Sequence, residues 1–330
     1  MNKVIKMGVV GVGSMGFHHV RIYCQLAESG LVELVGVADI NYERALSVAK
    51  IFKTKAFKEY KELLELVDAV SIATPTETHK DIALEFINAG KHVLVEKPIT
   101  SNVKEALELV RKAEEMHVVL MVGHVERYNP AVVKLREIIK NGLLGEIVTI
   151  TAKRVGPFDP RVAKTSVIVD LAIHDIDIIN SLLGSKVISL YARSRKVHPD
   201  SLEEDYGLIT LTYENQVDAV VETNRLTPYK VRSLEVVGTK GIVALDYIEQ
   251  KIKMYDGEWI REAIIQKEEP LKLEILNFIK VIERVDKPMI MKEEALYALL
   301  IAEVALESSR KNKLILLRDY IAEKGYEIML

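Results

Sequence analysis

The sequence predicts an α/β protein of two domains. Residues 1–123 are expected to form a doubly wound parallel sheet, and residues 124–330 an α+β domain with a large, open and mostly antiparallel sheet. Three observations support this: β-rich and helical segments alternate as far as Gly123, a glycine motif follows the first strand, and the later strands are long and close in sequence. A chain of 330 residues also exceeds the usual size of one core.

The first domain is expected to contain five strands joined by helical crossovers. The strands are predicted at residues 4–10, 31–39, 69–73, 90–95 and 118–122, with helices at 15–29, 78–89 and 102–116. Right-handed crossovers between parallel strands place helices on both faces of such a sheet. The basic segments 50–61 and 311–318 carry interleaved apolar or acidic residues and are interpreted as solvated helix faces.

The second domain is expected to begin with a helix at 130–141, a strand at 146–154 and an irregular segment at 155–166. Six strands are then predicted at 187–196, 205–213, 216–224, 231–238, 241–247 and 251–255. Tight turns at Glu214-Asn215 and Thr239-Lys240 indicate antiparallel pairing. Helices at 271–285 and 292–312 follow. The pattern of the tail, 314–330, favours neither a helix nor a strand.

Composition and charge argue against several classes of partner. A net charge of -3 creates no general field that would attract nucleic acid or an anionic membrane. The single cysteine, Cys24, cannot form an intramolecular disulfide, which fits a reducing compartment. No stretch reaches the roughly 18 apolar residues that cross a bilayer. We therefore expect a cytoplasmic protein with neither nucleic-acid nor membrane partners.

The glycine motif predicts a dinucleotide site. Gly11, Gly13 and Gly16 are separated as in a Gly-x-Gly-x-x-Gly motif, which here follows a strand and opens a helix, as in a Rossmann domain. These glycines permit a tight turn, close approach of a pyrophosphate, and close helix packing. The N–H groups at the helix start, near Ser14 and Met15, attract phosphate.

The end of the second strand indicates which dinucleotide binds. Asp39 stands where a carboxylate accepts hydrogen bonds from the adenosine ribose, which favours NAD. Arg44, one turn later, leaves NADP as the alternative. Thr74 and Pro75 follow the third strand and are expected to line the cofactor groove at the carboxyl edge of the sheet.

A second group of motifs carries a resemblance to a known family. Glu96-Lys97-Pro98 ends the next strand, and it occurs together with the glycine loop, the segments 73–79, 123–130 and 170–184, and C-terminal helices that end near Ser308-Ser309. In these motifs, and over nearly all its length, the chain resembles the glucose-fructose oxidoreductase, inositol dehydrogenase and MocA (Gfo/Idh/MocA) family.

The resemblance implies an NAD-dependent dehydrogenase that acts on CH–OH groups. It implies that Lys97 lies beside the nicotinamide and the reacting carbon, and that Asp170 and His174 come from a helix of the second domain. Residues four apart share a helical face, so Asp170 and His174 are expected to point the same way. His174 is the candidate base, because its ordinary pKa suits proton transfer near neutral pH. His79 and Glu96 complete the expected cofactor contacts.

The substrate is expected to be a sugar. The segment 123–130 resembles the subgroup of this family that acts on UDP-linked N-acetyl sugars, and His124 and Arg127 are either substrate contacts or structural groups. Arg154, Arg161 and Lys164 are interpreted as a cation cluster for a pyrophosphate. Many relatives carry a glycine-rich run before the aspartate, whereas residues 164–169 here do not, which bears on the shape of the pocket.

Three functions follow from these features. The first is oxidation of C3 of a UDP-N-acetylhexosamine such as UDP-N-acetylglucosamine; the second is an inositol or free-sugar dehydrogenase. The third is a non-catalytic dinucleotide-binding regulator, which the presence of Lys97, Asp170 and His174 disfavours. The histidines show no metal-ligand spacing, so no metal is expected. A homodimer or homotetramer is expected from the broad sheet.

Overall fold

The computed structural model describes residues 4–326, which divide into two compact units. Unit 1 comprises the described part of Met1–Val125 together with Leu271–Leu296. Unit 2 comprises Glu126–Pro270 and the described part of Tyr297–Leu330. Residues 271–296 thus belong to the N-terminal unit although they lie far along the chain. The division into functional domains at residue 123 stays a prediction.

Unit 1 is built on a six-stranded parallel sheet with the order β3-β2-β1-β4-β5-β6. The strands are β1 (Ile5–Val10), β2 (Val32–Ala38), β3 (Lys55–Phe57), β4 (Ala69–Ile72), β5 (His92–Glu96) and β6 (Leu120–Gly123). The central strands are almost wholly buried and apolar, as a parallel sheet covered on both faces requires. The strand order reverses between β1 and β4, and ligands of such sheets bind at the carboxyl ends beside this point.

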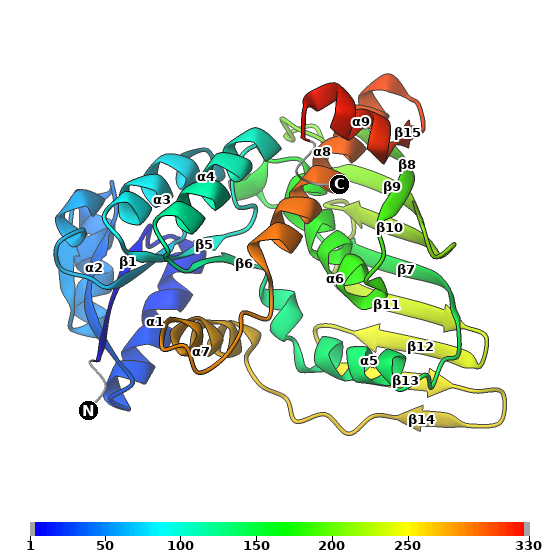
Figure 1. Cartoon of the computed structure of the whole chain (residues 1–330), viewed down its shortest axis with the longest axis horizontal. Helices are drawn as coiled ribbons and strands as arrows, with labels where there is room; N and C mark the ends of the chain where they lie inside the picture. Colours follow the sequence, from blue (N-terminus) through cyan, green and yellow to red (C-terminus); the bar gives the residue numbers. More distant parts are fainter. Residues whose placement is uncertain (1–3, 327–330) are drawn as a thin grey trace. The chain divides into compact units, whose positions relative to one another are not determined.

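Helices cover both faces of this sheet, which confirms the doubly wound prediction (Figure 1). Helix α1 (Ser14–Glu28) packs against α2 (Tyr42–Phe52), and α3 (His79–Asn88) against α4 (Val103–Glu115). Helix α7 (Pro270–Ile282) also belongs to this unit. Short 3-10 turns lie at η1 (Tyr60–Leu63) and η2 (Thr76–Thr78).

One strand of unit 1 was not predicted. The basic segment 50–61 was interpreted as a helix face, but α2 ends at Phe52 and β3 follows at Lys55–Phe57. Lys53 ends the helix in a left-handed conformation with a φ of 52°, which turns the chain into the strand. A strand of three residues is too short for the alternation of apolar residues to reveal it.

Unit 2 is built on a nine-stranded sheet with the order β14-β13-β12-β11-β7-β10-β9-β8-β15. All neighbours pair antiparallel except β7 and β10, so the mostly antiparallel prediction is confirmed. The Thr239-Lys240 turn joins paired Gly238 and Gly241. The strands are β7 (Ile147–Val155), β8 (Val187–Arg195), β9 (Tyr206–Tyr213), β10 (Asp218–Asn224), β11 (Val231–Gly238), β12 (Gly241–Asp246), β13 (Lys251–Tyr255), β14 (Ile260–Glu262) and β15 (Ile315–Leu316).

Two helices lie on one face of this sheet. Helix α5 (Pro130–Lys140) packs on β12 and β13, and α6 (Ile173–Leu183) packs on β7 and β10. The short turns η3 (Val125–Tyr128) and η4 (Pro160–Val162) and the π-helix η5 (Ile168–Ala172) precede them along the chain or connect them. In the middle of β7 the side chains alternate: Ile150, Ala152 and Arg154 are buried, whereas Thr151 and Lys153 are exposed.

The C-terminal region differs from the expectation of a helix face at 311–318. Helix α8 (Lys292–Lys311) ends there, β15 follows, and α9 (Leu317–Lys324) ends the described chain. Residues 327–330 of the ambiguous tail lie outside the described residues. Within residues 4–326, every helix is too short or too polar to cross a membrane.

Candidate active site

The turn between β1 and α1 allows a ligand to approach its backbone. Gly11 has a φ of +82°, and a Cβ there would lie 2.7 Å from the Ala73 carbonyl oxygen. A Cβ at Gly16 would collide with the Gly11 carbonyl, so both positions require glycine. At Gly13, in contrast, a Cβ would meet no atom within 4 Å, so the space before the first turn of α1 is open.

This open space fits the pyrophosphate of a dinucleotide. Gly13 is the N-cap of α1, and no side chain accepts a hydrogen bond from the first N–H groups of the helix. Those N–H groups and the helix dipole favour an anion. Ser14 is exposed and Met15 is half-buried, so both lie at the surface where the predicted cofactor would bind.

Asp39 follows β2 and is bound from three directions. Its carboxylate accepts hydrogen bonds from the N–H groups of Val12 (2.9 Å) and Asn41 (2.8 Å). The Arg44 guanidinium binds both carboxylate oxygens, at 2.8 and 3.0 Å. Burial raises the pKa of Asp39, but these partners outweigh burial and hold that pKa below its ordinary value. Asp39 is therefore ionised at neutral pH, and Arg44 lies beside it.

Lys97 lies directly after β5, at the carboxyl edge of the sheet, and is half-buried. The Lys97–Pro98 peptide bond is cis. Glu96 is the last residue of the strand, and its carboxylate lies 2.9 Å from His19 Nε2, within hydrogen-bond distance. His79 lies between two loops, with its ring nitrogens 2.9 Å from the carbonyl oxygens of Pro98 and Thr74.

In unit 2, Asp170 is held by a residue that was not predicted. Arg225, which follows β10, donates to the Asp170 carboxylate at 2.6 Å and is 3% exposed. Its other terminal nitrogen donates to the carbonyl oxygens of Val162 and Thr165, at 3.0 and 2.7 Å. One guanidinium therefore fixes both the candidate aspartate and the irregular segment before it.

The helix that carries Asp170 and His174 begins irregularly. Asp170 lies in the π-helix η5, where the N–H of Ile173 donates to the carbonyl of Ile168, five residues earlier. His174 lies in the first turn of α6 and is half-buried. The segment is helical as predicted, and it begins with a π-helical turn, a feature that is common at functional sites. That Asp170 and His174 point the same way stays a prediction.

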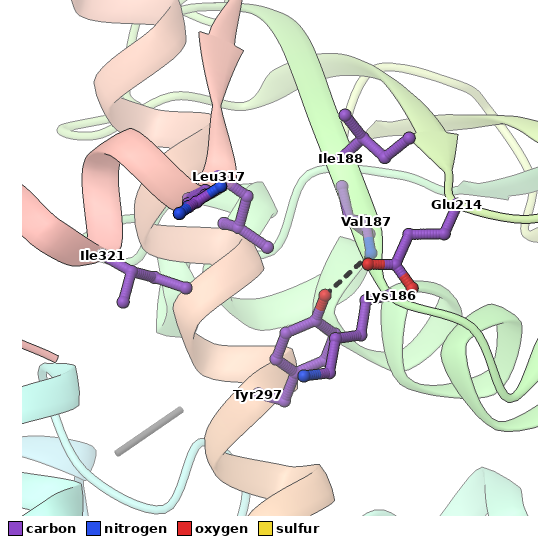
Figure 2. Close-up of a pocket in the computed structure, with 8 residues that line it drawn as sticks. Lys186, Val187, Ile188, Glu214, Tyr297, Leu317 and Ile321 are labelled. Atoms are coloured by element: carbon purple, nitrogen blue, oxygen red, sulfur yellow. Dashed lines mark hydrogen bonds between the residues drawn. The ribbon is translucent and has the colours of Figure 1, made fainter. Parts of the chain in front are cut away.

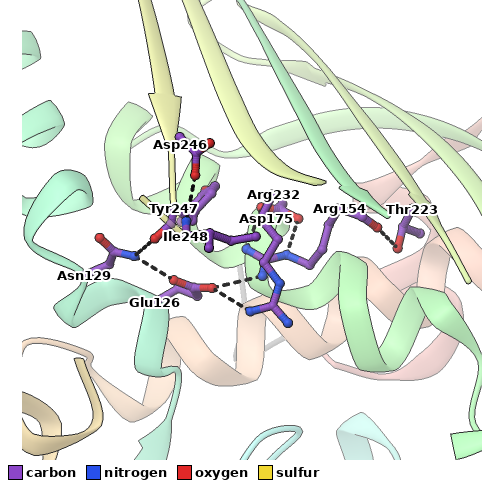
Figure 3. Close-up of polar contacts among 9 residues, drawn as sticks. All are labelled: Glu126, Asn129, Arg154, Asp175, Thr223, Arg232, Asp246, Tyr247 and Ile248. Atoms are coloured by element: carbon purple, nitrogen blue, oxygen red, sulfur yellow. Dashed lines mark hydrogen bonds and ion pairs between the residues drawn. The ribbon is translucent and has the colours of Figure 1, made fainter. Parts of the chain in front are cut away.

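Arg154 belongs to a buried ionic network rather than to an exposed loop (Figure 3). It lies in β7, is 2% exposed, and donates to Asp175 at 2.8 and 3.1 Å and to Glu126 at 3.0 Å. Its guanidinium also lies 5.0 Å from the ring centre of Tyr247. Burial raises the pKa of Asp175, and the positive charge of Arg154 opposes that rise. This burial corrects the grouping of Arg154 with the loop cations.

Arg232 pairs with Arg154 across β11 and β7 but is 38% exposed. Its ion pair with Glu126 is long, 3.7 Å, and within residues 4–326 its side chain makes no hydrogen bond. Burial and the like charge of Arg154 lower its pKa.

Sequence patterns did not single out Arg225 or Arg232. The signal that could have done so is an arginine at or just beyond the end of a strand, on the face that bears the predicted helix.

The remaining predicted substrate residues have different surroundings. Arg127 is 2% exposed and binds Asp177 through two hydrogen bonds of 2.6 and 2.8 Å, which is a structural role. His124 is buried directly after β6. Arg161 is 76% exposed, and its guanidinium is bound by the Asp159 carboxylate at 2.7 to 3.1 Å.

A cavity of about 310 Å³ lies elsewhere in unit 2 and contains none of these residues (Figure 2). It lies between the β8 end of the sheet, α8 and α9, where the Tyr297 hydroxyl accepts a hydrogen bond from the Val187 N–H at 2.9 Å. Its lining is formed by Lys186, Val187, Ile188, Glu214, Tyr297, Leu317, Arg318 and Ile321. The candidate chemistry therefore lies outside this cavity.

Comparisons with known proteins identify the family and the fold of the chain. Residues 5–124 match the model of an oxidoreductase family with an NAD-binding Rossmann fold, and residues 132–244 match the Gfo/Idh/MocA C-terminal domain. UDP-N-acetylglucosamine 3-dehydrogenase of Acidithiobacillus ferrooxidans is 34% identical over 76% of this chain and 77% of its own. The solved structure of that organism's enzyme, GnnA, has a TM-score of 0.84 at 29% identity, covering 93% of this chain and 98% of its own. The NAD-dependent scyllo-inositol 2-dehydrogenase of Bacillus subtilis is 29% identical over 74% of each chain.

The Rossmann sheet, the open glycine loop and the dehydrogenase relatives define the class as an NAD-dependent dehydrogenase. The chain belongs to the Gfo/Idh/MocA oxidoreductase family.

Proposed function

We propose that this dehydrogenase oxidises the C3 hydroxyl of a UDP-N-acetylhexosamine, with UDP-N-acetylglucosamine as the leading candidate. The observation that carries the proposal is the 34% identity to a UDP-N-acetylglucosamine 3-dehydrogenase over three quarters of both chains. The solvent-accessible cations of unit 2, Arg161, Lys164 and Arg232, support it, because a pyrophosphate needs such partners and an uncharged polyol does not.

We propose that Lys97, Asp170 and His174 perform the chemistry. NAD, when held by the glycine loop and Asp39, would supply the acceptor for the hydride of the carbinol carbon. His174 takes the proton of the same hydroxyl, so that CH–OH becomes C=O while one hydride and one proton leave. Lys97 donates a hydrogen bond to that oxygen and stabilises its developing negative charge. Asp170, held by Arg225, accepts a hydrogen bond from a neighbouring sugar hydroxyl.

The cofactor contacts are proposed for the glycine loop, for Asp39 and for the loop that contains Thr74 and Pro75. Gly13 leaves open space before the α1 N-terminus, and the ionised Asp39 can accept bonds from ribose hydroxyls. These residues belong to unit 1, as does Lys97, so binding of NAD and the position of Lys97 depend on the same sheet edge.

Oxidation of an inositol or a free sugar is the second candidate. It is favoured by the 29% identity to an NAD-dependent scyllo-inositol 2-dehydrogenase over 74% of each chain. A screen that measures NADH formation with UDP-N-acetylglucosamine, other UDP-sugars, inositols and free hexoses separates the two candidates. Turnover of UDP-N-acetylglucosamine supports the first candidate. Efficient turnover of an uncharged polyol, together with no turnover of any UDP-sugar, supports the second candidate instead.

We also propose that the protein is a homodimer or homotetramer. Side chains of β7 such as Thr151 and Lys153 point away from the helices and are exposed, so the outer sheet face offers a broad surface. Light scattering during size-exclusion chromatography tests this, and the mass of a monomer at micromolar concentration would contradict it.

A further inference from the structure

Buried histidines hold both residues that flank Lys97. The Glu96 carboxylate lies 2.9 Å from His19 Nε2, and the Pro98 carbonyl oxygen lies 2.9 Å from His79 Nδ1. Both imidazoles are 1% exposed. His19 comes from α1, the helix that begins at the glycine loop, and His79 is the first residue of α3. The segment around Lys97 is therefore tied to two different helices of unit 1.

His79 also reaches a second loop. Its Nε2 lies 2.9 Å from the Thr74 carbonyl oxygen, in the loop that follows β4. Strands β4 and β5 are neighbours in the sheet, so the ring bridges the segments at their adjoining carboxyl ends. One of these segments contains Lys97, and the other is expected to line the cofactor groove.

Both contacts of the His79 ring nitrogens are to backbone oxygens. Both partners are carbonyl oxygens, which accept hydrogen bonds and do not donate them. A neutral imidazole donates to one of them, and an imidazolium donates to both. Burial lowers the pKa of His79, while the carbonyls of Pro98 and Thr74 and the charge of Glu96 act in the opposite direction. Both ring nitrogens therefore face backbone oxygens.

We propose that His79 is a positioning residue for hydride transfer: it fixes the Lys97–Pro98 segment to the Thr74 loop and so holds Lys97 at a constant place beside the cofactor groove. The proposal rests on the proposed role of Lys97 but not on the identity of the sugar. Displacement of a reacting group by about 1 Å can cost about 10²-fold in rate, so loss of the bridge should be visible in kcat.

The test compares three variants. His79→Phe keeps a ring but removes both hydrogen-bonding nitrogens, and His79→Gln restores a side chain that can donate. His92→Phe is the matched control. His92 is the first residue of β5, the strand that precedes Lys97, and its Nδ1 accepts a hydrogen bond from the Val119 N–H at 2.9 Å. We expect His79→Phe to lower kcat at least about tenfold while the Kd for NADH changes less than about threefold. His79→Gln should recover part of kcat, and His92→Phe should retain it.

A second readout does not depend on turnover. Amide hydrogen exchange should become faster at residues 74–76 and 97–100 in His79→Phe, and should stay unchanged there in His92→Phe. If His79→Phe does not fold, His79→Ala, which also removes both ring nitrogens, takes its place in both measurements. Equal losses of kcat in His79→Phe and His92→Phe would overturn the proposal, as would weaker NADH binding with an unchanged kcat. If the parent oxidises inositol and not UDP-sugars, the substrate proposal fails. The kcat values of the His79 and His92 variants are then compared with inositol as the substrate, so the proposal for His79 is still tested.

Discussion

We propose that Asp39 and Arg44 together set the cofactor preference. The Asp39 carboxylate disfavours the 2'-phosphate of NADP by charge repulsion, and it also occupies the Arg44 guanidinium with two hydrogen bonds. The sequence predicted the first effect. It did not predict the second, because the side-chain direction of Arg44 depends on how α2 begins after β2. The structure thus places the Arg44 cation against the carboxylate that binds it.

We predict that Asp39→Ser shifts preference toward NADP, because it frees Arg44 for the 2'-phosphate. A charge-assisted hydrogen bond contributes about 1.5–3 kcal/mol, so the ratio of kcat/KM for NADP to that for NAD should rise at least about tenfold. Steady-state kinetics with both cofactors measures the ratio. Addition of Arg44→Ala should abolish the gain, and an unchanged ratio in Asp39→Ser would refute this interpretation of Arg44.

We predict that Lys97→Ala separates chemistry from cofactor binding. NADH affinity should be retained, because it depends on the glycine loop and Asp39, while hydride transfer should fall about 10²- to 10³-fold. Lys104→Ala, at an exposed position on α4, is the control and should behave as the parent. NADH fluorescence and single-turnover kinetics give the two quantities. Parent-like turnover in Lys97→Ala would remove Lys97 from the mechanism.

We predict that His174→Ala shows a related loss that depends on pH. The deficit should become smaller as pH rises, because hydroxide then removes the proton that His174 takes in the parent. The pH profile of kcat for the variant and the parent measures this. A deficit that stays constant with pH would indicate that His174 binds the substrate and is not the base.

At the scale of elements, local patterns and long-range contacts were not equally predictable. The glycine loop was predicted because strand, turn and helix follow one another within a few residues. The link between Arg225 and Asp170 was not, because the partners are separated by 55 positions and meet only when β10 and η5 pack together. The same holds for Arg154, since its partners Asp175 and Glu126 lie on other elements.

We predict opposite behaviour for two glycines of the cofactor loop. Gly13→Val should leave the free energy of unfolding within about 0.5 kcal/mol of the parent, because its Cβ would meet no atom, yet weaken NADH binding at least tenfold. Gly11→Ala should destabilise the protein itself by about 1 kcal/mol or more, because its φ is +82° and its Cβ would meet Ala73. Chemical denaturation and NADH titration distinguish them. Parent-like NADH binding in Gly13→Val would contradict the pyrophosphate site.

We predict that Arg154→Met acts on stability. It leaves the buried Asp175 and the nearly buried Glu126 without their main partner, which typically costs about 3–5 kcal/mol. Arg161→Ala, at the exposed loop cation, should leave the unfolding midpoint unchanged. If Arg154→Met were as stable as the parent and raised only the KM for the sugar, the original view of Arg154 as a substrate ligand would be restored.

At the scale of the whole molecule, the order of elements was largely predictable from the sequence, and the membership of residues 271–296 in unit 1 was not. Alternating strands and helices indicated the parallel sheet, and closely spaced strands indicated the antiparallel one. Residues 271–296 join unit 1, although no local pattern distinguishes α7 from a helix that packs on the nearer sheet. The two-residue strand β15 is likewise too short to give a period.

Transfer of the C3 hydrogen is the central claim, and isotopic labelling tests it most directly. The protein would be incubated with NAD and UDP-N-acetylglucosamine that carries deuterium at C3, and the mass of the NADH would be measured. We predict NADH that is heavier by one deuterium, and unlabelled NADH when the deuterium is placed at C2 or C4 of the sugar. Unlabelled NADH from the C3-deuterated substrate, or no NADH at all, would contradict the proposed function.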